Sequence, residues 1–377
     1  MLKKFLKVLV FSIVIVLVTL AFAGVLFVKF SPEFGGKHAA ADIERYKASG
    51  HYENGKFQNI MDTNMDMNAK EMMELLPEFL RGVPNSEPDF EVPIQHLDSA
   101  EIAKVDSVTK VIWFGHSAFL IHIDGKHILL DPMLGPVPAP HPWLGKKRYE
   151  KELPIEIEQL PNIDAIIISH DHYDHLDYGS IQKLKAKTRQ FFVPLGVGAH
   201  FREWGVSADQ IQELNWWDEV NFEGTKLAFT PSRHFSGRGP TDRWSTMWGS
   251  WVIIGQKDKL YFSGDGGYGA HFKQIGDTYG PFDFAMMECG QYNKRWADIH
   301  MMPEETAQAA MDVRAKVFMP IHWASFTLAL HSWTDPVVRV LKKSKEINQP
   351  IYVPMIGQEV DINTPFPEQT YWWEKPN

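Results

Sequence analysis

The chain has 377 residues, of which 44% are hydrophobic and 23% are charged, a composition that excludes a largely disordered or collagen-like protein. With 38 basic and 47 acidic residues, the formal net charge is −9, so the whole chain offers no basic surface for nucleic acid. The single cysteine, Cys289, excludes intramolecular disulfides and cysteine-based zinc clusters. The 16 histidines leave imidazole and carboxylate as the ligands from which a metal site would be built.

The N-terminal segment has the pattern of a membrane helix. Residues 8–28 are uncharged and almost wholly apolar, and at 1.5 Å per residue they are long enough to cross a hydrocarbon core of about 30 Å. Lys3, Lys4 and Lys7 precede the run, so the positive-inside rule places the N-terminus in the cytoplasm and the rest of the chain on the other side. A cleaved signal peptide is the alternative, because residues 21–23 (Ala-Phe-Ala) resemble a cleavage site. The length of the run favours an uncleaved anchor over residues 1–30.

The character of the sequence changes near residue 105. Residues 31–105 are polar, with a Met-rich helical piece at 61–80, and we expect an N-terminal extension and linker. Beyond them, helical patterns occur at 181–187 and 303–314. Short β-type runs separated by turn residues lie at 111–114, 119–123, 127–130, 165–168, 191–193, 227–229, 251–254, 260–262, 284–287 and 317–319. The pattern predicts one mixed α/β domain over residues 106–365, followed by a tail at 366–377.

The most informative segment follows the apolar run at 165–168. His170 and His172 are two residues apart, a spacing that would point them to different sides of a helix, so they converge on one ion only from a strand end or a loop. Asp174 and His175 follow immediately and are candidates for a second ion. Crowding these groups without a cation would leave polar groups desolvated, which favours a metal site over the alternative of a polar surface cluster.

Three later residues repeat this arrangement. His234, Asp265 and His322 each follow an apolar strand, as His170 does. Taken singly, each would be an ordinary polar residue of a core or loop. Taken with the four earlier candidates, they provide enough ligands for two metal ions.

The motif of His170, His172, Asp174 and His175 resembles the His-x-His-x-Asp-His motif of the metallo-β-lactamase-fold hydrolases. That resemblance implies a four-layer αββα sandwich with the site at one edge of two packed sheets. It also implies a ligand set in which one zinc is held by His170, His172 and His234, the other by Asp174, His175 and His322, and both by a bridging Asp265.

Within that superfamily, the chain resembles the N-acyl-phosphatidylethanolamine-hydrolysing phospholipase D family. The matching stretches are residues 113–117, 128–132, 216–219, 248–251, 262–268, 281–283, 304–307 and 321–323. The chain departs from the family pattern in its N-terminal apolar run and in Phe114, where another apolar residue is common. These departures bear on the substrate and not on the metal ligands.

The predicted chemistry follows from two cations that share Asp265. Such a pair lowers the pKa of a bridging water to about 7 and supplies hydroxide at neutral pH. Asp174 is counted among the catalytic residues as well as among the ligands. We expect a dinuclear zinc phosphodiesterase that acts on a phospholipid, although the ligand types also admit iron or manganese. The alternatives are a zinc-dependent lactone, ester or β-lactam hydrolase of the same fold, and a membrane envelope protein with a structural metal site. The sequence leaves the oligomeric state open.

Residues outside the ligand set complete the predicted site. His300 precedes a helix start, and the resemblance implies a catalytic histidine that orients or protonates the phosphate; the alternative is a surface-loop histidine. Asp131 is expected to accept a hydrogen bond from a ligating imidazole, unless it only forms the turn before Pro132. His116 also lies at an early strand end, and we expect it, like Asp131, to support the ligands or to contact the substrate. Trp216 and Trp217 are candidates for the wall of an acyl groove, although paired aromatic residues are more often part of a core.

Overall fold

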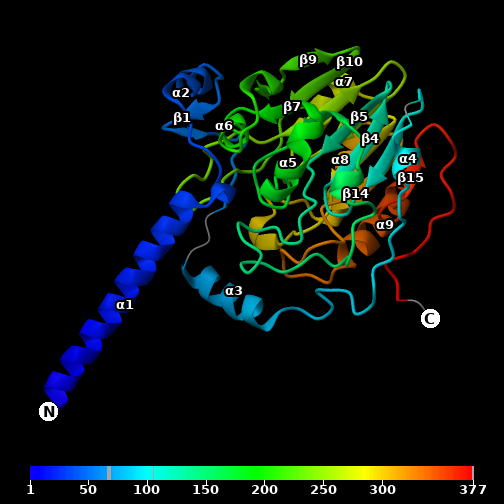
Figure 1. The fold of residues 1–377 in the computed structure, drawn as a ribbon. Helices are drawn as coiled ribbons and strands as arrows, with labels where there is room; N and C mark the ends of the chain where they lie inside the picture. Colours follow the sequence, from blue (N-terminus) through cyan, green and yellow to red (C-terminus); the bar gives the residue numbers. More distant parts are fainter. Residues whose placement is uncertain (66–68, 105, 376–377) are drawn as a thin grey trace.

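Alternating side chains along the early strands show how the sequence builds the interior. In β4 (Phe119–Ile123), Phe119 and Ile121 belong to one apolar cluster and Leu120 belongs to another on the opposite face. Because successive residues of a strand point to opposite faces, a strand that is apolar throughout must be covered on both sides. The computed structural model, which describes residues 1–65, 69–104 and 106–375, provides cover on both sides with two packed sheets and two outer layers of helices (Figure 1).

The first sheet has seven strands. Their order across the sheet is β15 (Glu359–Asp361), β3 (Lys110–Trp113), β4, β5 (Lys126–Leu130), β6 (Ile163–Ile167), β7 (Thr188–Pro194) and β8 (Ile211–Leu214). β5, β6, β7 and β8 run parallel to one another, whereas β15, β3, β4 and β5 pair antiparallel.

The second sheet has six strands. Their order is β14 (Phe318–Ile321), β13 (Phe284–Glu288), β12 (Lys259–Phe262), β11 (Ser250–Ile254), β10 (Thr225–Thr230) and β9 (Glu219–Phe222). β12, β13 and β14 are parallel, and the remaining pairs are antiparallel. The parallel strands of the two sheets deliver most of the loops that carry the candidate ligands.

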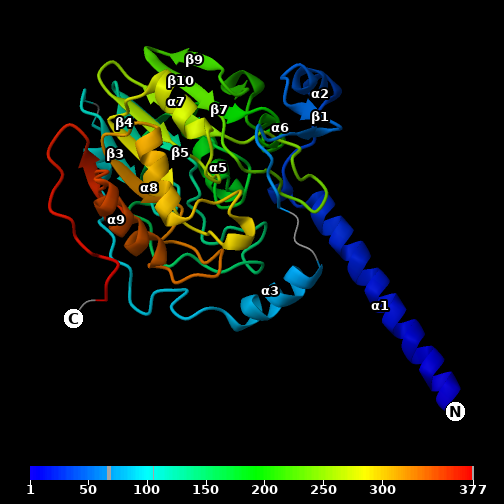
Figure 2. The same cartoon turned by 180° about the vertical axis from the view of Figure 1, so that it is seen from behind.

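Helices cover the outer face of each sheet. α5 (Tyr178–Leu184) and α6 (Gly198–Glu203) pack on the seven-stranded sheet, and α7 (His271–Tyr279), α8 (Pro303–Asp312) and α9 (Asp335–Ile347) pack on the six-stranded sheet (Figures 1 and 2). The largest cluster of buried apolar side chains lies between the two sheets. The expected four-layer αββα sandwich is therefore confirmed.

The N-terminal helix α1 (Leu2–Phe30) projects from the body as a long straight rod (Figures 1 and 2). None of the side chains of Leu2–Phe30 is buried, and the helix is long and apolar enough to cross a membrane. By length and composition it fits either a membrane anchor or a signal sequence near the N-terminus.

The segment after α1 folds onto the sandwich. It contains α2 (Ala40–Lys47), the β1–β2 hairpin (Tyr52–Glu53 and Lys56–Phe57), α3 (Ala69–Arg81) and α4 (Ser99–Ile102). Its side chains Tyr46, Phe57 and Val92 are buried in the cluster between the sheets, and Trp372 and Trp373 of the C-terminal segment join the same cluster. The domain boundaries at residues 30, 105 and 365 remain predictions, and the flanking segments contribute directly to the core.

The structure refines several local predictions. Within the Met-rich piece 61–80, the described residues from Ala69 onward are helical, whereas Asp62 and Thr63 accept hydrogen bonds from Arg233; residues 66–68 lie outside the described residues. The helical pattern at 181–187 becomes α5, which Asp177 caps by accepting the Ser180 N–H at 2.7 Å, followed by a 3₁₀ turn over Lys185–Lys187. The helices and strands that the sequence pattern did not indicate are α2, α4, α6, α7, α9, β1, β2, β8, β9 and β15.

Candidate metal centre

The candidate ligands lie where strands end. His170, His172, Asp174 and His175 follow β6, Asp265 follows β12, and His322 follows β14 directly. The carboxyl ends of parallel strands meet at one edge of a sheet, and here the two sheets bring their ligand-bearing loops together.

The first group consists of three imidazoles. The Nε2 atom of His170 lies 2.9 Å from Nδ1 of His172, and the Nε2 atom of His234 lies 3.2 Å from the same nitrogen. His234 donates from Nδ1 to the carbonyl of Ile299 at 2.9 Å, which turns its Nε2 toward the other two rings. The three nitrogens converge as ligands of one ion would.

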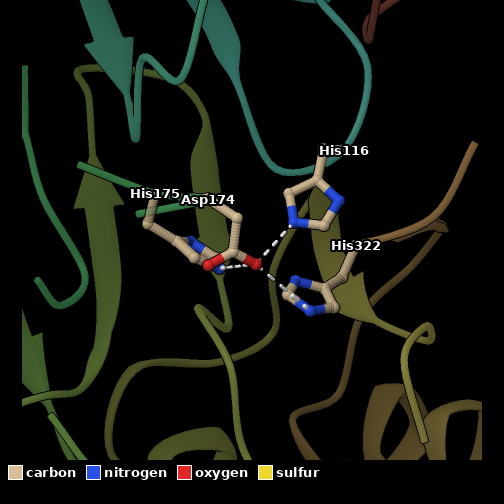
Figure 3. A group of neighbouring side chains, drawn as sticks. All are labelled: His116, Asp174, His175 and His322. Carbon is tan, nitrogen blue, oxygen red and sulfur yellow. Dashed lines mark hydrogen bonds and ion pairs between the residues drawn. The ribbon is translucent and has the colours of Figure 1, made fainter. Parts of the chain in front are cut away.

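The second group surrounds Asp174 (Figure 3). Its Oδ2 atom accepts a hydrogen bond from Nε2 of His116 at 2.9 Å and lies 3.6 Å from Nε2 of His175 and 3.8 Å from Nε2 of His322. His116, which the sequence grouped with Asp131 outside the ligand set, therefore contacts a candidate ligand directly. His116 is fully buried.

Asp265 contacts both groups. Its carboxylate oxygens lie 3.1 Å from Nε2 of His175 and 2.9 Å from Nδ1 of His322 in the second group. They also lie 3.9 Å from Nε2 of His170 and 3.8 Å from Nε2 of His234 in the first. This is the position that a bridging carboxylate requires.

The electrostatics of the site fit cations. Burial by itself would raise the pKa of Asp174 and Asp265, but the adjacent histidines, His175 first, outweigh it and hold both values well below the ordinary range. Burial lowers the pKa of His170 and His234 well below the usual value, so these rings are neutral. Ionised carboxylates and neutral imidazoles are the protonation states that metal ligands need. His175 differs from His170 and His234: burial would lower its pKa, but Asp265 and Asp174 outweigh burial and raise the pKa well above the usual value. Positive charge is therefore favoured beside these two carboxylates, and the donor types fit divalent ions.

Asp131 supports the second group from behind. It is buried, its Oδ2 accepts the Nδ1 proton of His175 at 2.7 Å, and its Oδ1 accepts the Ser169 N–H at 2.7 Å. His116, Asp131 and His322 all have left-handed backbones, with φ of 51°, 38° and 67°. Such conformations are uncommon for these residue types and cluster at functional sites, where the surrounding fold must hold them in place.

His300 faces the same centre from the loop before α8. Its ring centroid lies 5.1 Å from that of His234 and 5.2 Å from that of His322. Its Nδ1 atom bonds the buried Glu288 at 3.0 Å, so its Nε2 edge is the one left for a substrate.

A cavity of about 320 Å³ opens over these groups. Its polar lining includes His172, Asp174, Asp265, His300 and His322, together with two guanidinium groups, those of Arg243 and Arg295. Its apolar lining comes from Met65, Phe235, Trp296, Ile299 and Leu328. The cavity therefore combines a metal-type donor set, positive charge and apolar surface.

The comparisons with known proteins identify this arrangement. The model of the Beta-lactamase superfamily domain matches residues 126–323, which include every candidate ligand. The chain belongs to this superfamily.

Relatives in the superfamily share most of the chain. An uncharacterized protein of Mycobacterium tuberculosis is 38% identical over 348 residues, covering 91% of this chain and 92% of that protein. The N-acyl-phosphatidylethanolamine-hydrolyzing phospholipase D 1 of Caenorhabditis elegans is 32% identical over 252 residues, covering 64% of this chain and 70% of that protein. A possible metal-dependent hydrolase of Veillonella parvula shares the fold, with a TM-score of 0.55 and 17% identity over 67% of this chain and 99% of that one. The expected family resemblance is confirmed, and the chain is a metallo-β-lactamase-fold, metal-dependent hydrolase.

The two tryptophans expected near an acyl groove lie elsewhere in this superfamily domain. Trp216 is buried between the sheets, where its indole N–H donates to the carbonyl of Trp248 at 2.6 Å. Trp217 stacks on Tyr279 of α7. Neither lines the metal cavity, so the prediction of a substrate role for this pair is corrected to a packing role.

The sequence pattern missed residues that the fold brings to the site. Glu288 ends β13, so the same strand-then-ligand pattern that indicated His170 would have found it. Asp171, between the candidate ligands His170 and His172, is buried and accepts hydrogen bonds from Gly237 N–H at 2.8 Å and from the Thr246 hydroxyl at 2.7 Å. Arg243 and Arg295 gave no signal, because only the folded loops bring them to the cavity.

Proposed function

We propose that the chain is a dinuclear zinc phosphodiesterase that hydrolyses phospholipids by phospholipase D chemistry. The observation that carries the proposal is the carboxylate of Asp265, which lies 2.9 to 3.9 Å from imidazole nitrogens of both groups. His170, His172 and His234 would hold one ion, and Asp174, His175 and His322 the other. When bound, two divalent cations lower the pKa of a water molecule and polarise a phosphoryl oxygen.

The cavity wall supports an anionic, partly apolar substrate. Arg243 and Arg295 line it and bring positive charge, which attracts phosphate oxygens; Arg295 also bonds Glu78. Phe235, Ile299 and Leu328 add apolar surface beside them, which fits the glycerol backbone and first acyl carbons of a phospholipid. A soluble phosphate monoester would use only the polar half of this wall.

His300 has the position of the general acid. In the proposed reaction a water oxygen bonds to phosphorus and the bond from phosphorus to the headgroup oxygen breaks. In this step the doubly protonated ring of His300 donates its Nε2 proton to the departing oxygen while Nδ1 stays bonded to Glu288, and the attacking water loses a proton to solvent. The products are phosphatidic acid and the free headgroup alcohol.

The proposal is tested with the purified full chain in detergent micelles. Metal analysis should find two ions per chain, and a panel of phospholipids that includes N-acyl-phosphatidylethanolamine should release phosphatidic acid. In ¹⁸O-labelled water the label should enter the phosphatidic acid and not the headgroup alcohol. Hydrolysis of lactones or thioesters with no phospholipid turnover would instead support an ester hydrolase.

We further propose that α1 is an uncleaved single-pass anchor with a cytoplasmic N-terminus. Lys3, Lys4 and Lys7 precede the apolar run and Lys29 follows it, so the positive charge is concentrated on the N-terminal side. The test adds protease to the non-cytoplasmic side of the membrane while that membrane stays sealed. We expect the protease to degrade the body of the chain and to spare a tag at the N-terminus. A mature protein that begins near Gly24 would contradict the anchor.

A further inference from the structure

The helix α3 exposes an apolar face next to the metal cavity. Met73, Leu76 and Leu80 are 71%, 59% and 80% exposed and follow one another at helical spacing, so they form one stripe. Leu75, on the other side of the helix, is buried against the body. Large apolar side chains gathered on one exposed face mark an interaction surface.

A second exposed segment combines aromatic, aliphatic and basic side chains. We call His141–Arg148 the basic-aromatic loop, because it carries the exposed Trp143 and Leu144 and then the exposed Lys146 and Lys147. The Trp143 ring lies 5.9 Å from that of Phe27 in the last turn of α1, although Trp143 remains 67% exposed.

The contact with Phe27 fixes the depth of this loop relative to a bilayer. The apolar run of α1 ends at Val28 and is followed by Lys29, so a spanning α1 places Phe27 at the boundary between hydrocarbon and headgroups. Trp143 then lies at the same boundary, where tryptophan is enriched. Lys146 and Lys147 beside it suit anionic headgroups.

Hydrogen bonds connect both segments to the rim of the metal cavity. Glu78 of α3 accepts two hydrogen bonds from Arg295, at 3.1 Å each, and Arg295 lines the cavity. Farther along the chain, Glu87 pairs with Lys146 of the loop, and the Ser86 carbonyl accepts the Thr327 hydroxyl at 3.0 Å, next to the cavity residue Leu328. In both views α3 lies along the edge of the body toward which α1 extends (Figures 1 and 2).

We propose that the apolar face of α3 and the basic-aromatic loop form a second, interfacial contact with the bilayer that α1 spans, and that this contact holds the mouth of the metal cavity against the lipid surface. An amphipathic helix of this kind lies in the plane of the interface with its apolar face in the acyl region. A phospholipid reaches the cavity from the leaflet without crossing water. This inference rests on the proposed anchor and deepens the proposed phospholipid substrate.

The contact is tested by site-directed labelling of the full chain. Cys289 is fully buried, so a cysteine introduced at an exposed position is the one that reacts with a thiol fluorophore. Leu80→Cys reports on α3. Lys273→Cys is the control, since Lys273 is exposed and belongs to α7, which lies at the opposite edge of the body from α3 (Figure 1). In vesicles of phosphatidylcholine and phosphatidylglycerol with spin-labelled acyl chains, we expect several-fold stronger quenching at position 80 than at position 273.

Equal quenching at the two positions overturns the proposal. Failure of position 80 to react with the fluorophore, without any quenching by lipid, also overturns it, because a second copy of the chain would then cover α3.

A second measurement uses activity. Leu76→Ser combined with Leu80→Ser should lower phospholipid hydrolysis in vesicles several-fold and leave hydrolysis of soluble bis(p-nitrophenyl) phosphate unchanged, whereas Val338→Ser on α9 should leave both unchanged. An equal loss on both substrates contradicts the interfacial role. If the wild type hydrolyses neither, the proposed function fails while the quenching result still decides the membrane contact.

Discussion

The carboxylate of Glu288 holds the imidazole of His300. Its Oε1 atom lies 3.0 Å from Nδ1 of His300, and its Oε2 atom accepts the N–H of Met301 at 3.0 Å. Glu288 is fully buried at the end of β13, whereas His300 is partly open to the cavity. This hydrogen bond fixes the orientation of the ring and directs its other nitrogen toward the cavity, so Glu288 is a positioning residue.

Replacing Glu288 by glutamine should lower kcat by about 10- to 100-fold, the usual cost of losing a partner that orients a functional side chain. We expect KM and metal content to change little, because Glu288 is not in the proposed ligand set. The measurement is steady-state kinetics with metal analysis of the same sample. Glu304→Gln is the control, since Glu304 pairs with Arg339 away from the cavity and its loss should leave kcat unchanged. A parallel loss of metal would contradict the positioning role.

Glu288 also predicts a pH dependence. Burial raises its pKa to about 8 from an ordinary value of 4.5, against the opposing effect of His300. A carboxyl whose pKa is higher in the folded state contributes stability that is present below pH 4.5 and is lost as the pH rises through about 8. We therefore expect the metal-free wild type to lose unfolding free energy over this interval relative to Glu288→Gln. Urea unfolding of the chelator-treated proteins measures the unfolding free energy of the wild type and of Glu288→Gln. A difference between the two that does not change with pH would refute the effect.

Asp131 should control metal affinity. It accepts the Nδ1 proton of His175 at 2.7 Å and thereby directs Nε2 toward Asp265. Asp131→Asn weakens this acceptor, and we expect metal affinity to fall by about 10- to 100-fold. Competition with a chromogenic chelator measures it. Asp209→Asn, at an exposed carboxylate that accepts a hydrogen bond from the Ser207 hydroxyl, should retain wild-type affinity.

The sequence was informative about ligands because strand ends are local features. An apolar run followed by a polar residue marks the carboxyl end of a buried strand, and this pattern, taken together with the spacing of His170, His172, Asp174 and His175, indicated Asp265 and His322 as candidate ligands. The fold brings these candidates together because parallel strands in both sheets end at the same edge. The same rule applied to Phe284–Glu288 would have added Glu288.

Long-range contacts had no such signal. Asn59 and His234 are 175 residues apart, yet their side chain and backbone exchange two hydrogen bonds. Residues 31–105 resemble a linker because their polar composition hides single buried side chains such as Tyr46 and Phe57, which the sandwich covers only after it forms. Trp216 was misassigned for the opposite reason, because a tryptophan in a core and a tryptophan in a groove have the same sequence appearance.

His300→Ala should separate catalysis from metal binding. If the ring protonates the departing oxygen, its loss should lower kcat by about 10²- to 10⁴-fold, the range of general acid catalysis. Both ions should remain, since His300 lies beside the proposed ligands and is not one of them. Substrates with a good leaving group, such as p-nitrophenyl esters of phosphate, need less protonation and should lose less activity. An unchanged kcat with a natural phospholipid would refute the assignment.

Asn59→Ala should show that the N-terminal segment supports the metal centre. The Asn59 side chain donates to the His234 carbonyl at 2.7 Å and accepts the His234 N–H at 3.2 Å, so it fixes the backbone of a proposed ligand from both sides. Its loss leaves two partly buried backbone groups without this partner, which costs about 1–3 kcal/mol of stability. We also expect weaker metal binding, because His234 is less well positioned. Chemical unfolding and chelator competition measure the two effects, with Gln58→Ala as the exposed neighbour that should change neither. Loss of stability with unchanged metal affinity would mean that the segment only supports the fold.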